Sequence, residues 1–389
     1  MPGSTRSFEM ARRMVEAGHQ VHIITSDRLR SGRPYLTTEA GIQITWIPVK
    51  YSNHLNPWAR IRSFLRFAIR SGYLAAHIDA DIVFATSTPL TIALPAVFTK
   101  RRRRIPMVFE VRDLWPEIPI QMGYLNNSLL QLSAKKLETF AYRNATHIVT
   151  ASPGMTQGVI SSGIPQERVS TIPNSCDFDR FDIGPELGES FRARHDWLGS
   201  RPLVVYTGTL GTVNGVGYLV HVAAHAWSID PSVRFLVVGS GKEESRIRSL
   251  ASKLGILNKN FFMMPMVAKD KMPSILSAAS FTTSTVIDVP ALWHNSANKF
   301  FDSLAASRPI AINHEGWLAD LIREYQAGIV LSPTDHQKAA ETLIKALHDI
   351  QWMASSGKRA YALGKAQFSR DHLARELIDI LESVSGTAS

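Results

Sequence analysis

One stretch in the second half of the chain combines residue types that bind phosphate and sugar hydroxyls. Asn298 and Lys299 begin a predicted helix over 298–307, and Asp302 follows one turn later. Backbone N–H groups at a helix start are unpaired and lie at the positive end of the helix dipole, so they attract phosphate, and Lys299 adds a formal charge. The short carboxylate of Asp302 can accept hydrogen bonds from a diol. The alternative is an exposed helix start with its usual Lys and Asp.

Two glycine-bearing turns each come directly after a predicted strand, and the first of them, with Gly208 and Gly211, is a candidate for binding a diphosphate. Glycine lets the backbone approach a pyrophosphate closely at such strand-to-helix turns. The spacing differs from the dinucleotide pattern G-x-G-x-x-G, so a simple tight turn is the alternative. The candidate residues of these turns are Gly208, Thr209, Gly211, Gly239, Gly241 and Lys242.

A concentrated set of charged and aromatic residues follows a predicted strand in the first half. Arg112, Asp113, Trp115 and Glu117 come directly after the apolar run 107–111. Ligands bind at the carboxyl ends of strands in parallel sheets, so these side chains are candidates for a second site. A loop with this many charges could also be merely solvated.

Alternating short apolar runs and amphipathic segments predict parallel sheets covered by helices in both halves of the chain. The predicted strands of the first half are 21–25, 42–49, 81–85, 107–111, 147–151 and 169–172, and its helices are 4–18, 58–77, 89–99, 128–144 and 154–162. The predicted strands of the second half are 203–206, 234–239, 261–264, 282–286, 309–312 and 329–331, and its later helices include 298–307, 317–326, 335–349 and 359–383.

A chain of 389 residues exceeds what one core usually serves, so two domains are expected. We predict an α/β first domain over 1–172, an interdomain linker over 173–200 that is rich in Pro, Gly and Asp, and an α/β second domain over 201–365. A doubly wound domain normally opens with a strand, but this sequence begins within the loop that would follow it, so the first strand is expected to be missing.

The motifs resemble those of glycosyltransferase family 4. In that family two Glu residues eight apart precede a small-residue helix, a Pro and a strand; here Asp302 takes the second Glu position and His294, eight residues earlier, the first. The string Arg112-Asp113-Leu114-Trp115-Pro116-Glu117 is similar to the acceptor-side loop of a branch that makes bacterial surface polysaccharides. The resemblance implies the GT-B fold: two Rossmann-like, doubly wound domains facing across a cleft, with a C-terminal helix over 366–385 packing back on the first domain.

The resemblance also implies roles for single residues. Arg112, Asp113, His294 and Lys299 would be catalytic, although His in place of Glu is a departure that leaves the role of His294 open. Met266 and Val267 would grip the base, with core packing as their alternative. The donor site would contain Gly208, Thr209, Gly211, Gly239, Gly241, Lys242, Met266, Val267, Asn298, Lys299 and Asp302. The acceptor side would contain Gly3, Ser4, Arg6, Trp115 and Glu117.

The implied reaction is a retaining transfer of a sugar from a nucleotide-diphosphate donor, UDP-linked and of the N-acetylamino-deoxy type as in N-acetylfucosaminyltransferases. The acceptor would be a saccharide or a lipid-linked saccharide in O-antigen, capsule or exopolysaccharide synthesis. No cofactor is expected, and no D-x-D metal motif is present. Two alternatives stay open: a non-hydrolysing sugar-nucleotide epimerase and a catalytically inactive GT-B scaffold.

Composition and charge narrow the partners. The single cysteine, Cys176, excludes an internal disulfide and a multi-cysteine zinc site, which fits a cytoplasmic protein. The net charge of +10 predicts an anionic partner, but no nucleic-acid-binding module surrounds the basic clusters. Arg60, Arg62, Arg66 and Arg70 recur at helical spacing beside apolar residues, and 100–104 is a basic run. This pattern predicts peripheral binding to an anionic membrane surface or, equally, a packed helix with a solvated basic edge.

Overall fold

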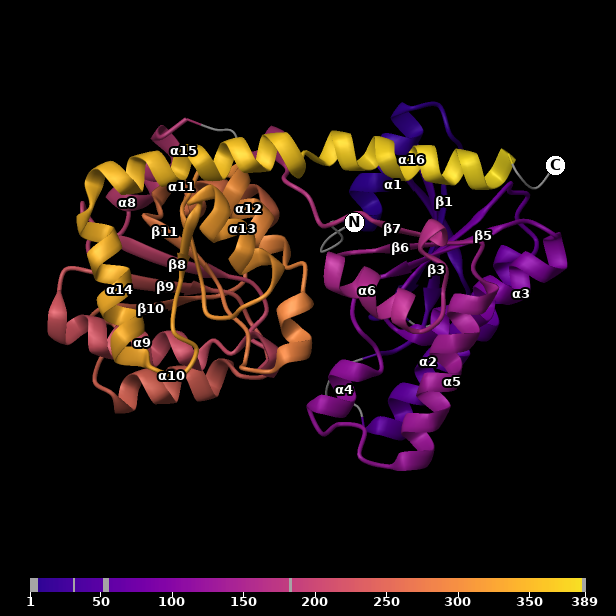
Figure 1. The fold of residues 1–389 in the computed structure, drawn as a ribbon, viewed down its shortest axis with the longest axis horizontal. Helices are drawn as coiled ribbons and strands as arrows, with labels where there is room; N and C mark the ends of the chain where they lie inside the picture. Colours follow the sequence, from indigo (N-terminus) through magenta and orange to yellow (C-terminus); the bar gives the residue numbers. More distant parts are fainter. Residues whose placement is uncertain (1–5, 31, 52–55, 182–183, 387–389) are drawn as a thin grey trace. The chain divides into compact units, whose positions relative to one another are not determined.

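The computed structural model describes residues 6–30, 32–51, 56–181 and 184–386, and the chain divides into two compact units (Figure 1). The first unit comprises residues 1–173 and 371–389, and the second comprises residues 174–370. Each is built on parallel strands with helices against them, so the predicted α/β fold class is confirmed. The site calls at Gly3 and Ser4 fall outside the described residues.

The first unit contains a four-stranded parallel sheet and a smaller mixed one. The parallel sheet has the order β4 (Val83–Thr86), β5 (Met107–Val111), β6 (His147–Thr150) and β7 (Val169–Thr171). In the smaller sheet β1 (His22–Asp27) pairs in parallel with β3 (Ile42–Pro48), which also pairs antiparallel with β2 (Tyr35–Glu39). The sequence patterns had not predicted β2. It is joined to β3 by a turn at Ala40 and Gly41, both of which have positive φ.

Alternate residues of the central strands face opposite layers of helices. Phe109 and Ile148 pack toward α3 (Ala93–Arg103), α5 (Ser128–Asn144) and α6 (Pro153–Ser161), whereas Val108 and Val149 pack toward α1 (Arg6–Glu16) and α16 (Arg370–Gly386). This period of two is that of a strand buried on both faces. The remaining helices of the unit are α2 (Pro57–Ala75), which packs on α3, and the short α4 (Glu117–Gln121).

The second unit is a six-stranded, fully parallel sheet. Its order is β10 (Phe261–Met264), β9 (Arg234–Val238), β8 (Leu203–Thr207), β11 (Phe281–Ser284), β12 (Ile310–Ile312) and β13 (Gly328–Val330). From β8 the chain winds first toward β10 and then returns to β11 on the other side, so the order reverses between β8 and β11. Open α/β sheets bind ligands outside the carboxyl ends of the strands at such a switch point.

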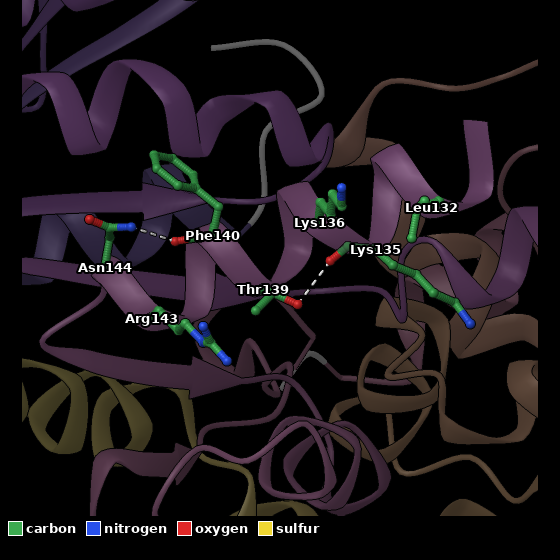
Figure 2. A pocket seen from close by; sticks show the side chains of 7 residues that line it. All are labelled: Leu132, Lys135, Lys136, Thr139, Phe140, Arg143 and Asn144. Carbon is green, nitrogen blue, oxygen red and sulfur yellow. Dashed lines mark hydrogen bonds between the residues drawn. The ribbon is translucent and has the colours of Figure 1, made fainter. Parts of the chain in front are cut away.

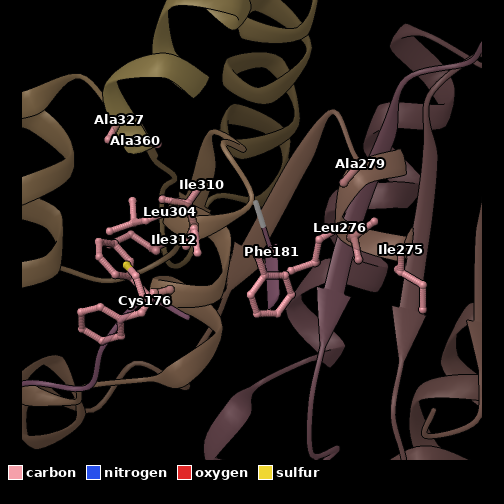
Figure 3. Packing of buried hydrophobic residues seen from close by; sticks show 14 of the residues in the cluster. Cys176, Phe181, Ile275, Leu276, Ala279, Leu304, Ile310, Ile312, Ala327 and Ala360 are labelled. Carbon is pink, nitrogen blue, oxygen red and sulfur yellow. The ribbon is translucent and has the colours of Figure 1, made fainter. Parts of the chain in front are cut away.

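Two apolar clusters cover the faces of this sheet. One joins β8 and β9 to α9 (Gly217–Ile229), α10 (Glu244–Lys253) and α14 (His336–His348). The other joins them to α8 (Glu186–Ala193), α11 (Met272–Ala278), α12 (Asn298–Ala305), α13 (Trp317–Tyr325) and α15 (Ile350–Gln367). Figure 3 shows Cys176 within this second cluster beside Leu304 and Ile312. The lone thiol is therefore a buried packing residue.

The expectation of a linker over 173–200 is corrected by the structure. Residues 174–370 belong to the second unit and include α7 (Phe178–Phe181) and α8, whose Phe181 and Phe191 lie in its core. Gly188 is needed here because a Cβ at this position would lie 2.6 Å from the backbone carbon of Ser277. The Pro and Gly content of the stretch reflects close packing and turns rather than a free tether.

The expected single helix over 359–383 is likewise wrong, because it is two helices, α15 and α16. Between them Phe368 is buried, its carbonyl accepts from the N–H of Cys176 at 2.7 Å, and Ser369 bridges to Cys176. The unit boundary follows at 370/371. Beyond it Leu373, Ala374 and Leu377 of α16 pack in the first unit with Val108, Val149 and Ile172.

We expect Leu377→Ala to destabilise the first unit by about 2–5 kcal/mol, because the fully buried leucine would leave a cavity against β5 and β6. Urea unfolding followed by hydrogen exchange of the β5 and β6 amides measures the effect. Asp379→Ala, an exposed position on the same helix, is the matched control. Equal protection in both variants would contradict the packing of α16 on this sheet.

Candidate functional site

Lys299 lies at the switch point of the second unit. Its ammonium contacts the Oδ1 of Asn214 at 3.4 Å and stands 5.1 Å from the ring centroid of Tyr206 at the end of β8. A Cβ on Gly208 would lie 3.3 Å from Lys299 Cε, so glycine leaves room for the lysine stem. The structure therefore brings the predicted residues Gly208 and Lys299 together. Asn214 is a neighbour that the sequence analysis did not select.

The two glycine turns are locked backbone to backbone. The N–H of Leu210 donates to the carbonyl of Ser240 at 2.9 Å, and a Cβ on Gly239 would lie 1.9 Å from the carbonyl oxygen of Gly208. Gly241 is equally constrained, because its Cβ would lie 2.5 Å from the Leu210 carbonyl oxygen. Only residues without side chains permit this approach. The turns after β8 and β9 thus form one rigid surface.

Burial controls the charge of the two ionisable groups on α12. Removal of water lowers the pKa of Lys299 to about 8, with Asp302 opposing the change. Burial raises the pKa of Asp302 to about 6, with Arg370 opposing it. At pH 7 the lysine is therefore mainly charged, and the carboxylate is ionised but costly to keep so. Both groups would gain from a ligand that pairs with them.

An ion cluster that the sequence analysis did not predict lies near Asp302. Arg370 donates to Asp177 Oδ2 at 2.9 Å and to the hydroxyl of Ser175 at 3.1 Å, and Arg180 pairs with Asp177 at 3.0 Å. Arg370 and Asp177 are both buried. These partners are 193 residues apart in sequence, so no local spacing could have found them. They set the electrostatic surroundings of Asp302 without a direct hydrogen bond to it.

The other predicted donor residues differ in placement. Asn298 is the first residue of α12, and His294 ends the short helix η5 (Pro290–His294). Lys242 is exposed, as is Thr209. Of the two residues expected to grip a base, Val267 packs against the core, whereas Met266 is 75% exposed. Core packing therefore explains Val267 but not Met266.

In the first unit, Asp113 accepts from the hydroxyl of Thr88 at 2.7 Å, and the N–H of Arg112 donates to the hydroxyl of Ser87 at 3.1 Å. The loops after β4 and β5 are thus joined at the carboxyl edge of the sheet. The residue Asp113 is exposed to solvent, but the protein around its carboxyl raises the pKa of that group by desolvation. A carboxylate in this position can accept a proton or a hydrogen bond from a sugar hydroxyl.

Arg6 has an internal role that the sequence analysis did not foresee. Its guanidinium donates to Glu110 at 2.7 Å and to the carbonyls of Ile172 and Pro173. Glu110 also accepts from Thr86 at 2.6 Å. Burial alone would raise the pKa of Glu110, but Arg6, Arg112 and Thr86 outweigh it and hold that pKa below its ordinary value. These hydrogen bonds of Arg6 link α1 to β5 and to the residues directly after β7, within the first unit.

The two remaining acceptor-side candidates lie on the loop beyond β5. Trp115 packs partly against the core, and the exposed Glu117 begins α4 and accepts from Gln121 at 2.7 Å.

A surface cavity of about 500 Å³ opens beside α5 (Figure 2). Its lining residues are Leu132, Lys135, Lys136, Thr139, Phe140, Arg143 and Asn144. The hollow is therefore basic, and its lining residues come later in the sequence than the Asp113 loop.

Comparison with known families decides the assignment. Residues 3–175 match the glycosyl transferase 4-like domain, and residues 189–363 match the glycosyl transferases group 1 domain. Together the two models cover most of the chain and divide it close to the boundary between the units. The chain belongs to the GT-B glycosyltransferases.

Solved GT-B structures share this fold at low sequence identity. The chain is similar to Anabaena HepE in complex with UDP-glucose, with a TM-score of 0.72 and 16% identity over 88% of this chain and 87% of that one. It is also similar to WaaG, a glycosyltransferase involved in lipopolysaccharide biosynthesis, with a TM-score of 0.70 and 18% identity over 96% and 94% of the two chains. The likeness confirms the fold predicted from the motifs.

Matches to curated sequences cover only part of each chain. An uncharacterized glycosyltransferase of Methanocaldococcus jannaschii is 21% identical over 63% of this GT-B chain and 62% of its own length. The gpi3 subunit of a phosphatidylinositol N-acetylglucosaminyltransferase of Schizosaccharomyces pombe is 22% identical over 71% of this chain and 56% of its own. The chain thus spans less than two thirds of these relatives. Among its described helices, none is long and apolar enough to cross a bilayer.

The raised pKa of Asp302 predicts that its charge costs stability. Because the folded pKa is about 6 and the unfolded value is near 3.8, the folded GT-B chain holds a proton that the unfolded chain has released, and stability falls as pH rises from about 4 to 6. We expect Asp302→Asn to remove this slope and to raise the free energy of unfolding at pH 7 by about 1–3 kcal/mol.

Urea unfolding of both proteins between pH 4 and pH 8, followed by circular dichroism, measures the difference. Asp288→Asn, at an exposed position, controls for the loss of a negative charge. Parallel curves for the wild type and Asp302→Asn would show that Asp302 is as well solvated as a surface carboxylate.

Proposed function

We propose that this chain transfers a sugar from a nucleoside-diphosphate donor to a hydroxyl acceptor. The observation that carries the proposal is the partly buried Lys299 cation against the Gly208 turn, at the switch point of the second unit. A diphosphate placed there would pair with a cation whose hydrogen-bond partner among the described residues is Asn214, at 3.4 Å. HepE, which shares this fold, was solved with UDP-glucose.

The proposed chemistry depends on stabilising the departing nucleoside diphosphate. As the bond from the anomeric carbon to the phosphate oxygen breaks, negative charge grows on the phosphates. A desolvated ammonium and the N–H groups at the start of α12 are already in place to meet that charge. Asp302, one turn along the helix, would accept hydrogen bonds from the ribose hydroxyls. These groups need not rearrange during the step, which is why such a site accelerates it.

On the acceptor side we assign Asp113 and Arg112. Asp113, with its raised pKa and its contact from Thr88, would accept the hydrogen bond of the attacking hydroxyl. We further propose that transfer retains the anomeric configuration. The donor would be UDP-linked and of the N-acetylamino-deoxy type, used in a surface-polysaccharide pathway. The Arg112 to Glu117 motif supports this finer assignment, and similarity to WaaG is compatible with it.

Incubation with a panel of labelled UDP-, GDP- and TDP-sugars and a lipid-linked saccharide acceptor tests the proposal. Transfer of label to the acceptor supports it. An epimerised nucleotide sugar without transfer would favour the epimerase alternative. Binding of nucleotide without any turnover would favour an inactive scaffold.

Lys299→Met should lower turnover by about 100-fold or more, because it withdraws the charge that meets the leaving diphosphate while preserving the apolar stem beside Gly208. Steady-state kinetics with the nucleotide sugar identified by the panel measures it. Lys253→Ala, which removes an exposed lysine at the end of α10, should change turnover less than twofold. Wild-type turnover in a folded Lys299→Met protein would place the phosphate site elsewhere.

We also propose that the first unit binds an anionic membrane surface, at the inner face of the cytoplasmic membrane, through α2. One stripe of this helix is apolar yet exposed, at Trp58, Ile61, Leu65, Ile69 and Tyr73. The exposed fractions of Trp58 and Ile69 are 76% and 73%, so the helix does not bury this stripe in the unit. Spacings of three and four residues align these side chains along one face, as in helices that lie in a membrane interface.

Cations accompany the stripe. Arg60, Arg62 and Arg66 of α2 are exposed, and the basic end of α3 lies next to α5, where Arg101 donates to Asn144. The cavity in Figure 2 adds Lys135, Lys136 and Arg143 of α5. Each cation near an anionic surface contributes roughly 1 kcal/mol, and the apolar stripe adds burial. Apolar and cationic groups together suit a surface of anionic lipid, which is also where a lipid-linked acceptor would be presented.

Replacing Ile69 by Glu should weaken binding to phosphatidylglycerol vesicles at least tenfold, because it places an anion in the apolar stripe. Sedimentation with anionic and with neutral phosphatidylcholine vesicles, at low and high salt, measures the effect. Ile350→Glu is the matched control, since Ile350 is 80% exposed but lies on the second unit. Full recovery of the wild type in the supernatant under all four conditions would end the membrane proposal and leave the transferase proposal intact.

A further inference from the structure

Four buried polar atoms without a hydrogen-bond partner among the described residues gather near the carboxyl ends of β11 and β12. They are Ser284 Oγ, Trp293 Nε1, Asn295 Oδ1 and His314 Nε2. Ser284 ends β11 beside Ile312 of β12, two residues before His314. Gly316 lies against the Trp293 backbone, and the indole of Trp317 donates to the carbonyl of Asn295 at 2.8 Å. These contacts place all four residues in one neighbourhood of the second unit.

Such a concentration calls for a ligand or ordered water. Buried polar atoms are hydrogen-bonded in native proteins with few exceptions, and each exception needs an explanation, such as a functional role or a water or ion that completes it. His314 is the sharpest case, because only 1% of the residue is exposed. It also lies close enough to Lys299 for the two charges to interact, and this adds to the burial that lowers the pKa of His314. The unpartnered atoms therefore adjoin the proposed phosphate site.

The hydrogen-bonding role of His314 follows from its other nitrogen. Its Nδ1 lies 2.7 Å from the carbonyl oxygen of Glu315, and a carbonyl can only accept, so Nδ1 carries the proton. Burial and Lys299 oppose a second proton. Nε2 is therefore left with a lone pair and can only accept. Trp293 Nε1 has the opposite character, since an indole N–H can only donate.

Because His314 Nε2 can only accept a hydrogen bond, its partner must be a group that carries a hydrogen to donate. Ionised phosphate oxygens have no hydrogen to donate, so they cannot satisfy Nε2, whereas they suit Lys299. A sugar hydroxyl or the N–H of an N-acetylamino group can donate to Nε2. A sugar oxygen can in turn accept from Trp293. His314 Nε2 and Trp293 Nε1 therefore match the sugar of a sugar nucleotide rather than its diphosphate.

We propose that His314 Nε2 accepts a hydrogen bond from a hydroxyl or amide N–H of the donor sugar, and that Trp293 Nε1 donates to an oxygen of the same sugar. The assignment rests on the proposed transferase function and adds the residues that distinguish the sugar from the nucleotide. Because the sugar is the part that is transferred, these residues would set donor specificity. Lys299 and Asp302 would hold the nucleoside diphosphate whatever sugar it carries.

Calorimetry with two matched probe pairs, UDP against UDP-glucose and GDP against GDP-mannose, tests this division. For the pair that the wild type binds, His314→Met should lower the affinity for the sugar nucleotide at least tenfold. It should change the affinity for the free nucleoside diphosphate less than twofold. His314→Gln, whose amide oxygen can reach the place of Nε2, should recover part of the loss. His225→Met, an exposed histidine on α9, is the matched control.

Trp293→Phe is a second, milder probe, because it removes the N–H and keeps an aromatic ring. It too should lower the affinity for the sugar nucleotide more than the affinity for the free nucleoside diphosphate. Equal weakening of both members of a pair would assign these residues to the diphosphate or to general packing. Unchanged affinities in folded variants would show that ordered water completes the four atoms. Either outcome overturns the proposal while the transferase function stands. A wild type that binds neither pair would overturn the transferase function and this assignment with it.

Discussion

The partial burial of Lys299 against the Gly208 turn is the interaction on which the proposed chemistry of the second unit depends. An ammonium deprived of water is costly, and here the cost shows as a pKa lowered to about 8. The glycine turns cannot move away to relieve it, since Gly239 and Gly241 are pressed against the carbonyls of Gly208 and Leu210. A cation held so rigidly in a poor environment is typical of a site arranged for an anion, because stability alone would favour an apolar residue there.

The sheet explains why these residues meet. Six parallel strands, buried on both faces, bring the loops after β8, β9, β11 and β12 to one edge. Strands of this kind appear in sequence as nearly continuous apolar runs, so most of them were predictable from the sequence with small errors in their bounds. The gathering of the Gly208 turn and Lys299 also followed from sequence, because parallel order alone places carboxyl ends together.

Other features depend on tertiary contacts that no local pattern encodes. The break between α15 and α16 exists because Phe368 enters the core and its carbonyl pairs with Cys176, far away in sequence. The pairing of Arg370 with Asp177 and the hydrogen bonds of Arg6 to Glu110 are of the same kind. Arg6 illustrates the limit well: its place in a family motif suggested a ligand contact, whereas its neighbours in space use its guanidinium internally.

The buried Glu110 and the partly buried Asp302 show how structural and functional charges can be told apart. Glu110 is surrounded by Arg6 and Thr86, and its pKa lies below the ordinary value, so its charge is stabilised within the fold. Asp302 receives only longer-range help, from Arg370, Arg180 and Lys269, and its pKa rises to about 6. Among the described residues, none donates a hydrogen bond to its side chain. The fold thus completes the hydrogen bonds of the first carboxylate, whereas those of the second remain available to a ligand.

The same contrast separates the two ring nitrogens of His314. Glu315 satisfies Nδ1, whereas no described residue satisfies Nε2. Incomplete pairing at Asp302 and Lys299 of α12 and at His314, in the loop after β12, is therefore a stronger indication of a binding site than any one of the sequence motifs.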